Sequence, residues 1–111
     1  IMTIAAGSRG SAWTDIINFG AADDAGQADI TNYKYFRVTN LDDTNYLELR
    51  VTGTADSFFV KVKAGESFLL MDNEIDAVAS GTAIGTLTDI TQIGANANTA
   101  AIDIEFVVVT A

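Results

Sequence analysis

Apolar and polar residues alternate along several stretches of this chain, and a period of two is typical of β-strands with one buried face. The clearest alternating runs are residues 30–40, 46–51, 57–63 and 101–110. In the second run Leu47, Leu49 and Val51 share one face, which we expect to point into a core. No run has the 3.6-residue period of an amphipathic helix. The pattern therefore predicts an all-β chain.

The first run predicts a long strand with two distinct faces. Its two sets of alternating side chains are Lys34, Phe36 and Val38 on one face and Tyr33, Tyr35 and Arg37 on the other. The last run changes along its length, because its second half, FVVV, is apolar on both faces. We therefore expect this final strand to lie either at the centre of a sandwich or against another subunit.

Three further segments predict strands from less regular patterns. Residues 12–19 alternate imperfectly before Gly20 and are expected to form the first strand. Residues 67–71, SFLLM, are short and apolar throughout, which predicts a strand covered on both faces. Residues 86–93, TLTDITQI, lie in a region rich in Gly, Ala and Thr and predict only a weak strand.

Short polar segments between these runs have the composition of tight turns. Residues 40–45, NLDDTN, predict a chain reversal, and residues 63–66, KAGE, predict a second one. Seven or eight strands joined in this way favour a two-sheet antiparallel β-sandwich, with jelly-roll and immunoglobulin-like topologies both open. A length of 111 residues fits a single domain, residues 1–111.

The composition excludes several kinds of chemistry. The chain has no cysteine and no histidine, so disulfides, thiolate metal sites and the usual general base are absent. Paired acids such as Asp42 and Asp43 fall in a predicted turn, whereas glycosidase carboxylates face each other across a cleft. We therefore expect a protein that is not an enzyme and that holds no cofactor and no metal ion.

The charge of the chain bears on its partners. Six basic and fifteen acidic residues give a net charge of −9, which repels phosphate backbones and argues against nucleic acid as a partner. No apolar stretch approaches the roughly 20 residues of a membrane span, so no membrane association is expected. The basic residues concentrate in the middle third of the chain, and four of them are candidate docking residues: Arg37, Arg50, Lys61 and Lys63.

The first ten residues, IMTIAAGSRG, are apolar and then rich in small residues. Their apolar part has no strand partner in the local pattern. We therefore expect residues 1–10 to form an arm that docks on a partner or on a neighbouring copy. The candidate docking residues of this arm are Ile1, Met2 and Ile4.

Aromatic residues suggest an alternative function. Exposed aromatic rings on β-sandwich modules can hold sugars, and Trp13, Tyr33 and Tyr35 are the candidates for such a platform. Aromatic residues in strands are more often core or cross-strand partners. A carbohydrate-binding module is therefore the alternative and not the main expectation.

Two sequence stretches carry a resemblance to a known class of protein. Residues 36–51, FRVTNLDDTNYLELRV, followed by residues 58–70, FFVKVKAGESFLL, resemble a pattern in small structural proteins of tailed bacteriophages. In those proteins a closing strand rich in apolar residues and Glu completes the domain, and residues 96–111 are similar to it. The segment 80–95 departs from the pattern as a longer insertion.

The resemblance implies a virion component, most simply a capsid decoration or cement protein on the outer surface of a phage head. Its implied partners are the major capsid protein and copies of itself, as a homo-oligomer with a trimer as one form. A self-assembling filament or tail subunit is a third hypothesis. Such a subunit donates one strand into its neighbour, and the apolar N-terminal segment and the FVVV strand suit this exchange.

Overall fold

The computed structural model describes residues 1–6, 13–20, 27–79, 81 and 83–110, and this part of the chain contains ten strands and no helix. It therefore also has no helix that could cross a membrane. The strands are β1 (Met2–Ile4), β2 (Thr14–Gly20), β3 (Ala28–Asp29), β4 (Tyr33–Asn40), β5 (Leu47–Gly53), β6 (Ser57–Val62), β7 (Ser67–Leu70), β8 (Glu74–Ile75), β9 (Thr88–Ala97) and β10 (Ile102–Thr110). The all-β prediction is confirmed. The expected seven or eight strands become ten because β1 was expected to be part of an arm and because β3 and β8, with two residues each, are too short to give a period.

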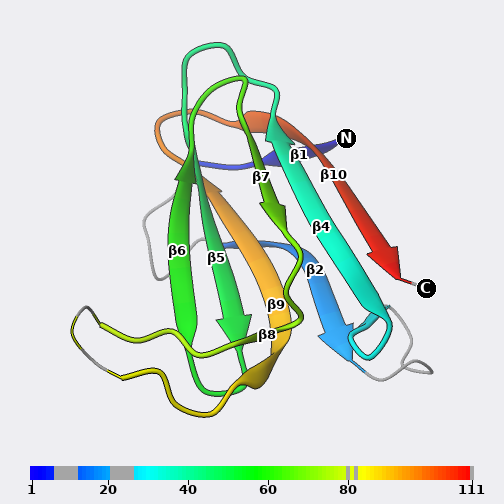
Figure 1. Ribbon diagram of the computed structural model, residues 1–111. Helices are drawn as coiled ribbons and strands as arrows, with labels where there is room; N and C mark the ends of the chain where they lie inside the picture. The colour runs from blue at the N-terminus through cyan, green and yellow to red at the C-terminus, as the bar shows by residue number, and fades with distance from the viewer. Residues whose placement is uncertain (7–12, 21–26, 80, 82, 111) are drawn as a thin grey trace.

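The strands form two sheets packed face to face (Figure 1). The smaller sheet has the order β1-β10-β4-β7, and the larger sheet has the order β3-β2-β9-β5-β6 with β8 paired to β9. Antiparallel pairs are nested along the chain: β5 with β6, then β4 with β7, β2 with β9, and β1 with β10. A long hairpin wrapped over itself in this way is a jelly roll, so the structure resolves the choice of topology against the immunoglobulin-like alternative.

The core lies between the inward faces of the two sheets. Leu47, Leu49 and Val51 of β5 are fully buried, as the alternation predicts. Phe36 and Val38 of β4 meet them from the smaller sheet and are also fully buried. The predicted turn at residues 63–66 is confirmed as well, because the Glu66 N–H donates to the Lys63 carbonyl at 3.0 Å and Gly65 has the positive φ of 76° that such a turn requires.

The strand predicted at residues 86–93 is confirmed, but it extends further along the chain and is not a weak element of the fold. β9 runs from Thr88 to Ala97 and lies between β2 and β5, at the centre of the larger sheet. Ile90 and Ile93 are both buried although they are three residues apart, because the pairing shifts so that Thr91 is an extra residue. Small residues such as Ala95, which lower β-propensity, fit here because residues 93–97 are all buried, whichever face of the strand they lie on.

The expected faces of β4 are correct only after its first two residues. Tyr33 is buried and Lys34 is exposed, the reverse of the expectation. The pairing with β10 shifts at this point, because Val109 pairs with Tyr35 and Thr110 pairs with Tyr33, which leaves Lys34 as an extra residue. Beyond this bulge Phe36 and Val38 point inward, and Tyr35 and Arg37 point outward, as predicted.

The prediction that residues 67–71 are covered on both faces is also wrong. Phe68 and Leu70 pack against the core, but Leu69 is 53% exposed and Met71 is 69% exposed. β7 is the edge strand of the smaller sheet, and no described element covers the outer side of that sheet.

Asn40, at the end of β4, connects the two sheets through its buried side chain. Its Nδ2 donates to the Val62 carbonyl of β6 at 3.1 Å and to the Asn45 carbonyl at 2.9 Å, and its Oδ1 accepts from the Asp42 N–H at 2.9 Å. Its backbone N–H donates to the Glu66 carbonyl at 3.0 Å. The side chain is fully buried, and each of these bonds satisfies a group that water does not reach.

Asp42 completes this corner, which accounts for the polar composition of residues 40–45. Its carboxylate accepts from the Asn45 N–H at 2.6 Å and from the Thr44 N–H at 3.0 Å. These backbone hydrogen bonds hold the pKa of the Asp42 carboxyl below its usual value. The turn predicted here is confirmed.

We expect Asn40→Ala to lower the free energy of unfolding by about 2–4 kcal/mol, because it leaves buried backbone groups of β6 and of the corner without partners. Urea denaturation monitored through Trp13 fluorescence measures this loss. The matched control is Asn32→Ala, since the Asn32 amide makes an exposed hydrogen bond of 2.6 Å to the Asp29 carboxylate and its loss should change stability by no more than about 0.5 kcal/mol. Equal effects of the two substitutions would contradict the role given to Asn40.

Candidate docking surface

The outer face of the smaller sheet carries a group of apolar side chains, which we call the outer patch. Its members are Tyr35, Leu69, Met71, Val107 and Val109. The strand register brings them together, because Arg37 pairs with Val107 on one side and with Leu69 on the other, and Tyr35 pairs with Val109. The inward direction of Phe36 and Val38 therefore sends these alternate residues outward.

A single basic side chain lies within the outer patch. Arg37 makes an ion pair with Glu105 of β10, with 3.7 Å between the guanidinium Nη2 and the carboxylate Oε1. Tyr35, Arg37, Leu69 and Met71 line a shallow hollow of about 330 Å³. An apolar side chain fits such a hollow, and the guanidinium at its rim can bond a carbonyl or carboxylate of the same partner.

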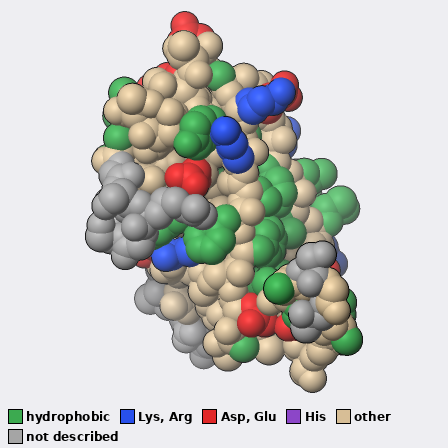
Figure 2. Space-filling model, turned by 90° about the vertical axis from the view of Figure 1, so that its left-hand side faces the viewer, with side chains coloured by type: hydrophobic (Ala, Val, Ile, Leu, Met, Phe, Trp, Pro, Cys, Tyr) green, Lys and Arg blue, Asp and Glu red, His purple; other side chains and the backbone are tan. Residues whose placement is uncertain are grey.

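The outer face of the larger sheet is different, because it combines basic and aromatic side chains. The guanidinium of Arg50 lies 4.9 Å from the Trp13 ring centroid, and the Trp13 and Phe59 rings are 5.6 Å apart. Arg50 also donates to the Gln92 Oε1 at 3.2 Å. Figure 2 views the molecule from the side of β6, where hydrophobic and basic side chains lie next to one another. The Trp13 ring is thus engaged by side chains of its own chain.

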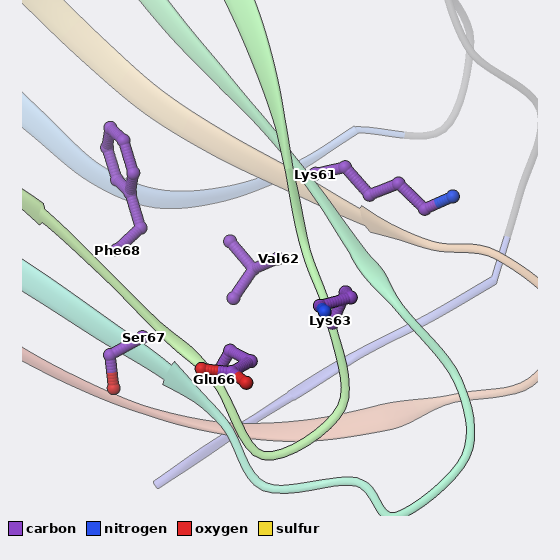
Figure 3. A pocket seen from close by; sticks show the side chains of 6 residues that line it. All are labelled: Lys61, Val62, Lys63, Glu66, Ser67 and Phe68. Carbon is purple, nitrogen blue, oxygen red and sulfur yellow. The ribbon is translucent and has the colours of Figure 1, made fainter.

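Lys61 and Lys63 lie where β6 turns into β7. The Lys61 ammonium is 4.0 Å from the Tyr46 ring centroid, a cation–π contact. A second shallow hollow, of about 300 Å³, is lined by six residues: Lys61, Val62, Lys63, Glu66, Ser67 and Phe68. Figure 3 shows Lys63 and Glu66 at the turn and Lys61 directed away from them.

The structure separates the four expected basic docking residues. Arg50, Lys61 and Lys63 belong to the side of the larger sheet, and Arg37 lies on the outer face of the smaller sheet. They therefore do not form one basic stripe. Arg37 lies beside the mostly aliphatic outer patch, and Arg50 lies beside Trp13 and Phe59, which is 47% exposed.

The expected N-terminal arm is in part a strand of the domain. Met2, Thr3 and Ile4 form β1 and pair with β10, and Ile4 is fully buried in the core. This strand partner lies at the far end of the sequence, so the local pattern could not show it. Ile1 is 89% exposed, and its role in docking stays a prediction; residues 7–10 of the expected arm lie outside the described residues.

The three aromatic residues expected to form a sugar platform are not neighbours. Tyr33 is buried against Phe19, with 5.5 Å between ring centroids, and its hydroxyl donates to the Leu70 carbonyl at 2.5 Å. Burial raises the pKa of Tyr33 to about 12. Trp13 lies on the outer face of the larger sheet, and Tyr35 lies on that of the smaller sheet.

The carboxyl groups of Asp56 and Asp76 lie next to each other; Asp76 directly follows β8. A hydrogen bond to the Asp76 side chain raises the pKa of the Asp56 carboxyl, and burial and charge repulsion from Asp76 act in the same direction. Asp76 also accepts from the Gly85 N–H at 2.5 Å. Within the described ranges no group of three or more acidic side chains is placed to hold a metal ion.

The outer patch was not identified as one site from the sequence, although its signal was present. The run SFLLM predicts a strand covered on both faces, and the run FVVV predicts a strand either at the centre of a sandwich or against another subunit; together they supply four of the five residues of the outer patch. Comparison of the chain with protein-family models, with curated proteins and with solved structures finds no match.

The Asp56–Asp76 pair makes a testable contribution to pH dependence. A folded-state pKa above the unfolded value means that the folded protein binds the proton more tightly, so this contribution to stability is present at low pH and is lost as the pH rises through the folded-state pKa. We expect Asp56→Asn to raise the thermal midpoint at pH 7 and to flatten its rise on acidification. Asp15→Asn, which removes one exposed charge elsewhere, is the control, and identical pH profiles for the two variants would contradict the pairing.

Proposed function

We propose that this protein is a non-enzymatic structural component of a tailed-phage virion, a decoration or cement protein that binds the outer surface of the capsid through its outer patch. The sequence resemblance at residues 36–70 and 96–111 supports the virion assignment. The jelly roll is found in viral capsid and lectin domains, so the fold is compatible with the proposal without deciding it.

The outer patch carries the proposal. Contiguous exposed apolar surface is uncommon on monomeric proteins and marks interaction sites. Leu69 and Met71, at 53% and 69% exposed, are large apolar side chains of this surface; Leu69 lies in β7, and Met71 directly follows that strand. Docking on a rigid strand face requires little ordering of the chain, so most of the apolar area buried contributes to affinity.

The charge distribution favours attachment by this face. The chain carries a net charge of −9, while the five side chains of the outer patch are uncharged and the neighbouring Arg37 is paired with Glu105. An acidic protein is repelled from nucleic acid, so it does not compete for the packaged genome. A cement protein stabilises a shell by bridging neighbouring capsid subunits, and specific interfaces of about 1,200–2,000 Å² are the usual unit of such contacts.

The carbohydrate-binding alternative has less support from the structure. Its three candidate rings are separated, and the exposed apolar side chains of the outer patch are mostly aliphatic. Aliphatic side chains suit a protein surface, whereas sugar platforms use aromatic faces.

We expect Leu69→Lys together with Met71→Lys to weaken binding to genome-free heads of the encoding phage by roughly 100-fold, because two exposed apolar side chains lose their burial in the complex. Co-sedimentation with the heads across a protein concentration series measures this. The fold should be unchanged within about 0.5 kcal/mol, because both side chains point away from the core.

The matched control is Ile84→Lys together with Leu87→Lys, which adds the same charges to exposed apolar residues of the segment before β9. This control should bind the heads as the unmodified protein does. Binding that is lost equally in both double variants would show a general charge effect, and binding retained by the outer-patch variant would overturn the proposed surface.

A further inference from the structure

The sandwich has one side on which its core is only partly covered. This side lies between β6 and β7, each the last strand of its sheet, and we call it the open side. The core-facing apolar side chains that remain partly exposed there are Phe58, Val60, Phe68 and Leu70. On the neighbouring strands the core-facing side chains Phe36, Val38, Leu49 and Val51 are fully buried. The open side therefore offers apolar surface that a further segment can bury.

Two shallow hollows lie along the open side. The hollow of about 300 Å³ at the turn between β6 and β7 is bounded by Val62 of β6 and Phe68 of β7. Another, of about 320 Å³, is bounded by Phe58 of β6 and Leu70 of β7. Each hollow thus reaches from one sheet to the other. Figure 2 shows hydrophobic side chains along this side of the molecule.

The two ends of the open side differ in charge. Lys61 and Lys63 line the hollow at the turn, together with one acid, Glu66. The other hollow is lined by three acids: Asp72, Glu74 and Asp76. A segment bound along this side is therefore attracted when it carries a basic residue at the acidic end and repelled when it carries an acid there.

The edge of β7 directs backbone groups toward the open side. Within the described residues β7 pairs only with β4, and the first and last strands, β1 and β10, lie on the other side of β4 (Figure 1). The Asn40 N–H donates to the Glu66 carbonyl at 3.0 Å, so Glu66 directs its carbonyl toward β4. Because backbone direction alternates along a strand, Ser67 and Leu69 direct their N–H and C=O groups toward the open edge. β7 also contains no charged residue and no proline, which commonly protect sheet edges.

We propose that β7 binds an extended apolar segment of a partner protein as an added antiparallel strand, with a Lys or Arg at the N-terminal end of that segment beside Asp72 and Glu74. β7 runs from the basic end of the open side to the acidic end, so an antiparallel segment begins at the acidic end. In recognition of this kind, main-chain hydrogen bonds give affinity and pockets for alternate side chains give specificity.

A second copy of β7 suits this edge less well than a basic partner. Glu66 and Asp72 flank β7, and two copies paired antiparallel about Leu69 would set these acids opposite one another. Like charges directly opposite are destabilising, and the net charge of −9 on each chain adds to the repulsion. The inference does not depend on the proposed capsid function, because it specifies the chemistry of the bound segment and not the protein that carries it.

The test compares two synthetic peptides of identical composition and opposite order, both acetylated and amidated at their ends. The forward peptide reads KKVTVTVT, and the reversed peptide reads TVTVTVKK. Non-specific attraction to an acidic protein is the same for both peptides, so a difference in affinity reports the orientation. We expect the forward peptide to bind roughly 5-fold more tightly, because its Lys residues then lie at the acidic end. Fluorescence anisotropy of labelled peptides measures the affinities, and amide hydrogen exchange should slow at Ser67 and Leu69 when the forward peptide is bound.

Matched variants separate the backbone contribution from the charge contribution. Leu69→Pro and Leu69→Ala both remove the exposed side chain, but only Leu69→Pro also removes an N–H that faces the open edge. Leu69→Pro should therefore bind the forward peptide roughly 5-fold more weakly than Leu69→Ala. Asp72→Asn together with Glu74→Gln leaves the backbone unchanged and should abolish the preference for the forward peptide, which keeps the test decisive if Leu69→Pro fails to fold.

Three results would each overturn the proposal. The first is that neither peptide binds the unmodified protein at about 1 mM. The second is equal affinity for the forward and reversed peptides. The third is equal affinity of folded Leu69→Pro and Leu69→Ala for the forward peptide.

Discussion

The buried amide of Asn40 is the interaction on which the arrangement of the two sheets depends. It stands at the end of β4 in the smaller sheet and bonds the last residue of β6 in the larger sheet, with the Val62 carbonyl 3.1 Å from its Nδ2. The same side chain holds the corner that leads into β5, and the Asn40 backbone holds the turn that leads into β7. A buried amide group without a hydrogen-bond partner lowers the stability of the fold. The end of β6, the corner that leads into β5 and the turn that leads into β7 are therefore held in one position relative to Asn40.

That position fixes which side chains of the smaller sheet face outward. Phe36 and Val38 enter the core beside β5, and the alternation of the strand then places Tyr35 and Arg37 outside. β7 pairs with β4 in a register that sets Leu69 beside Arg37, so the apolar side chains form one surface. A slip of one residue would exchange the two faces and remove the surface, which is why the corner and the turn bear on docking although neither contributes a side chain to it.

The alternating pattern predicted the strands with one buried face and the corner at residues 40–45, because both depend on local sequence. The pattern was less informative where pairing with strands distant in sequence decides how a segment folds. β9 has weak local preference but gains two partner strands, and β1 acquires its partner from the other end of the chain. Bulges at Lys34 and Thr91 reverse the alternation at single residues, and pattern alone does not locate them. The apolar runs at β7 and β10 were recognised, but burial within one subunit and burial against a partner give the same sequence signal.

The most direct test of docking through the outer patch is hydrogen–deuterium exchange of the protein alone and bound to genome-free heads of the encoding phage. Docking through the outer patch should slow exchange in β7 and in β4 around Tyr35 and Arg37, with little change in β6 of the larger sheet. Protection confined to the larger sheet, or no protection anywhere on mixing with the heads, would contradict it.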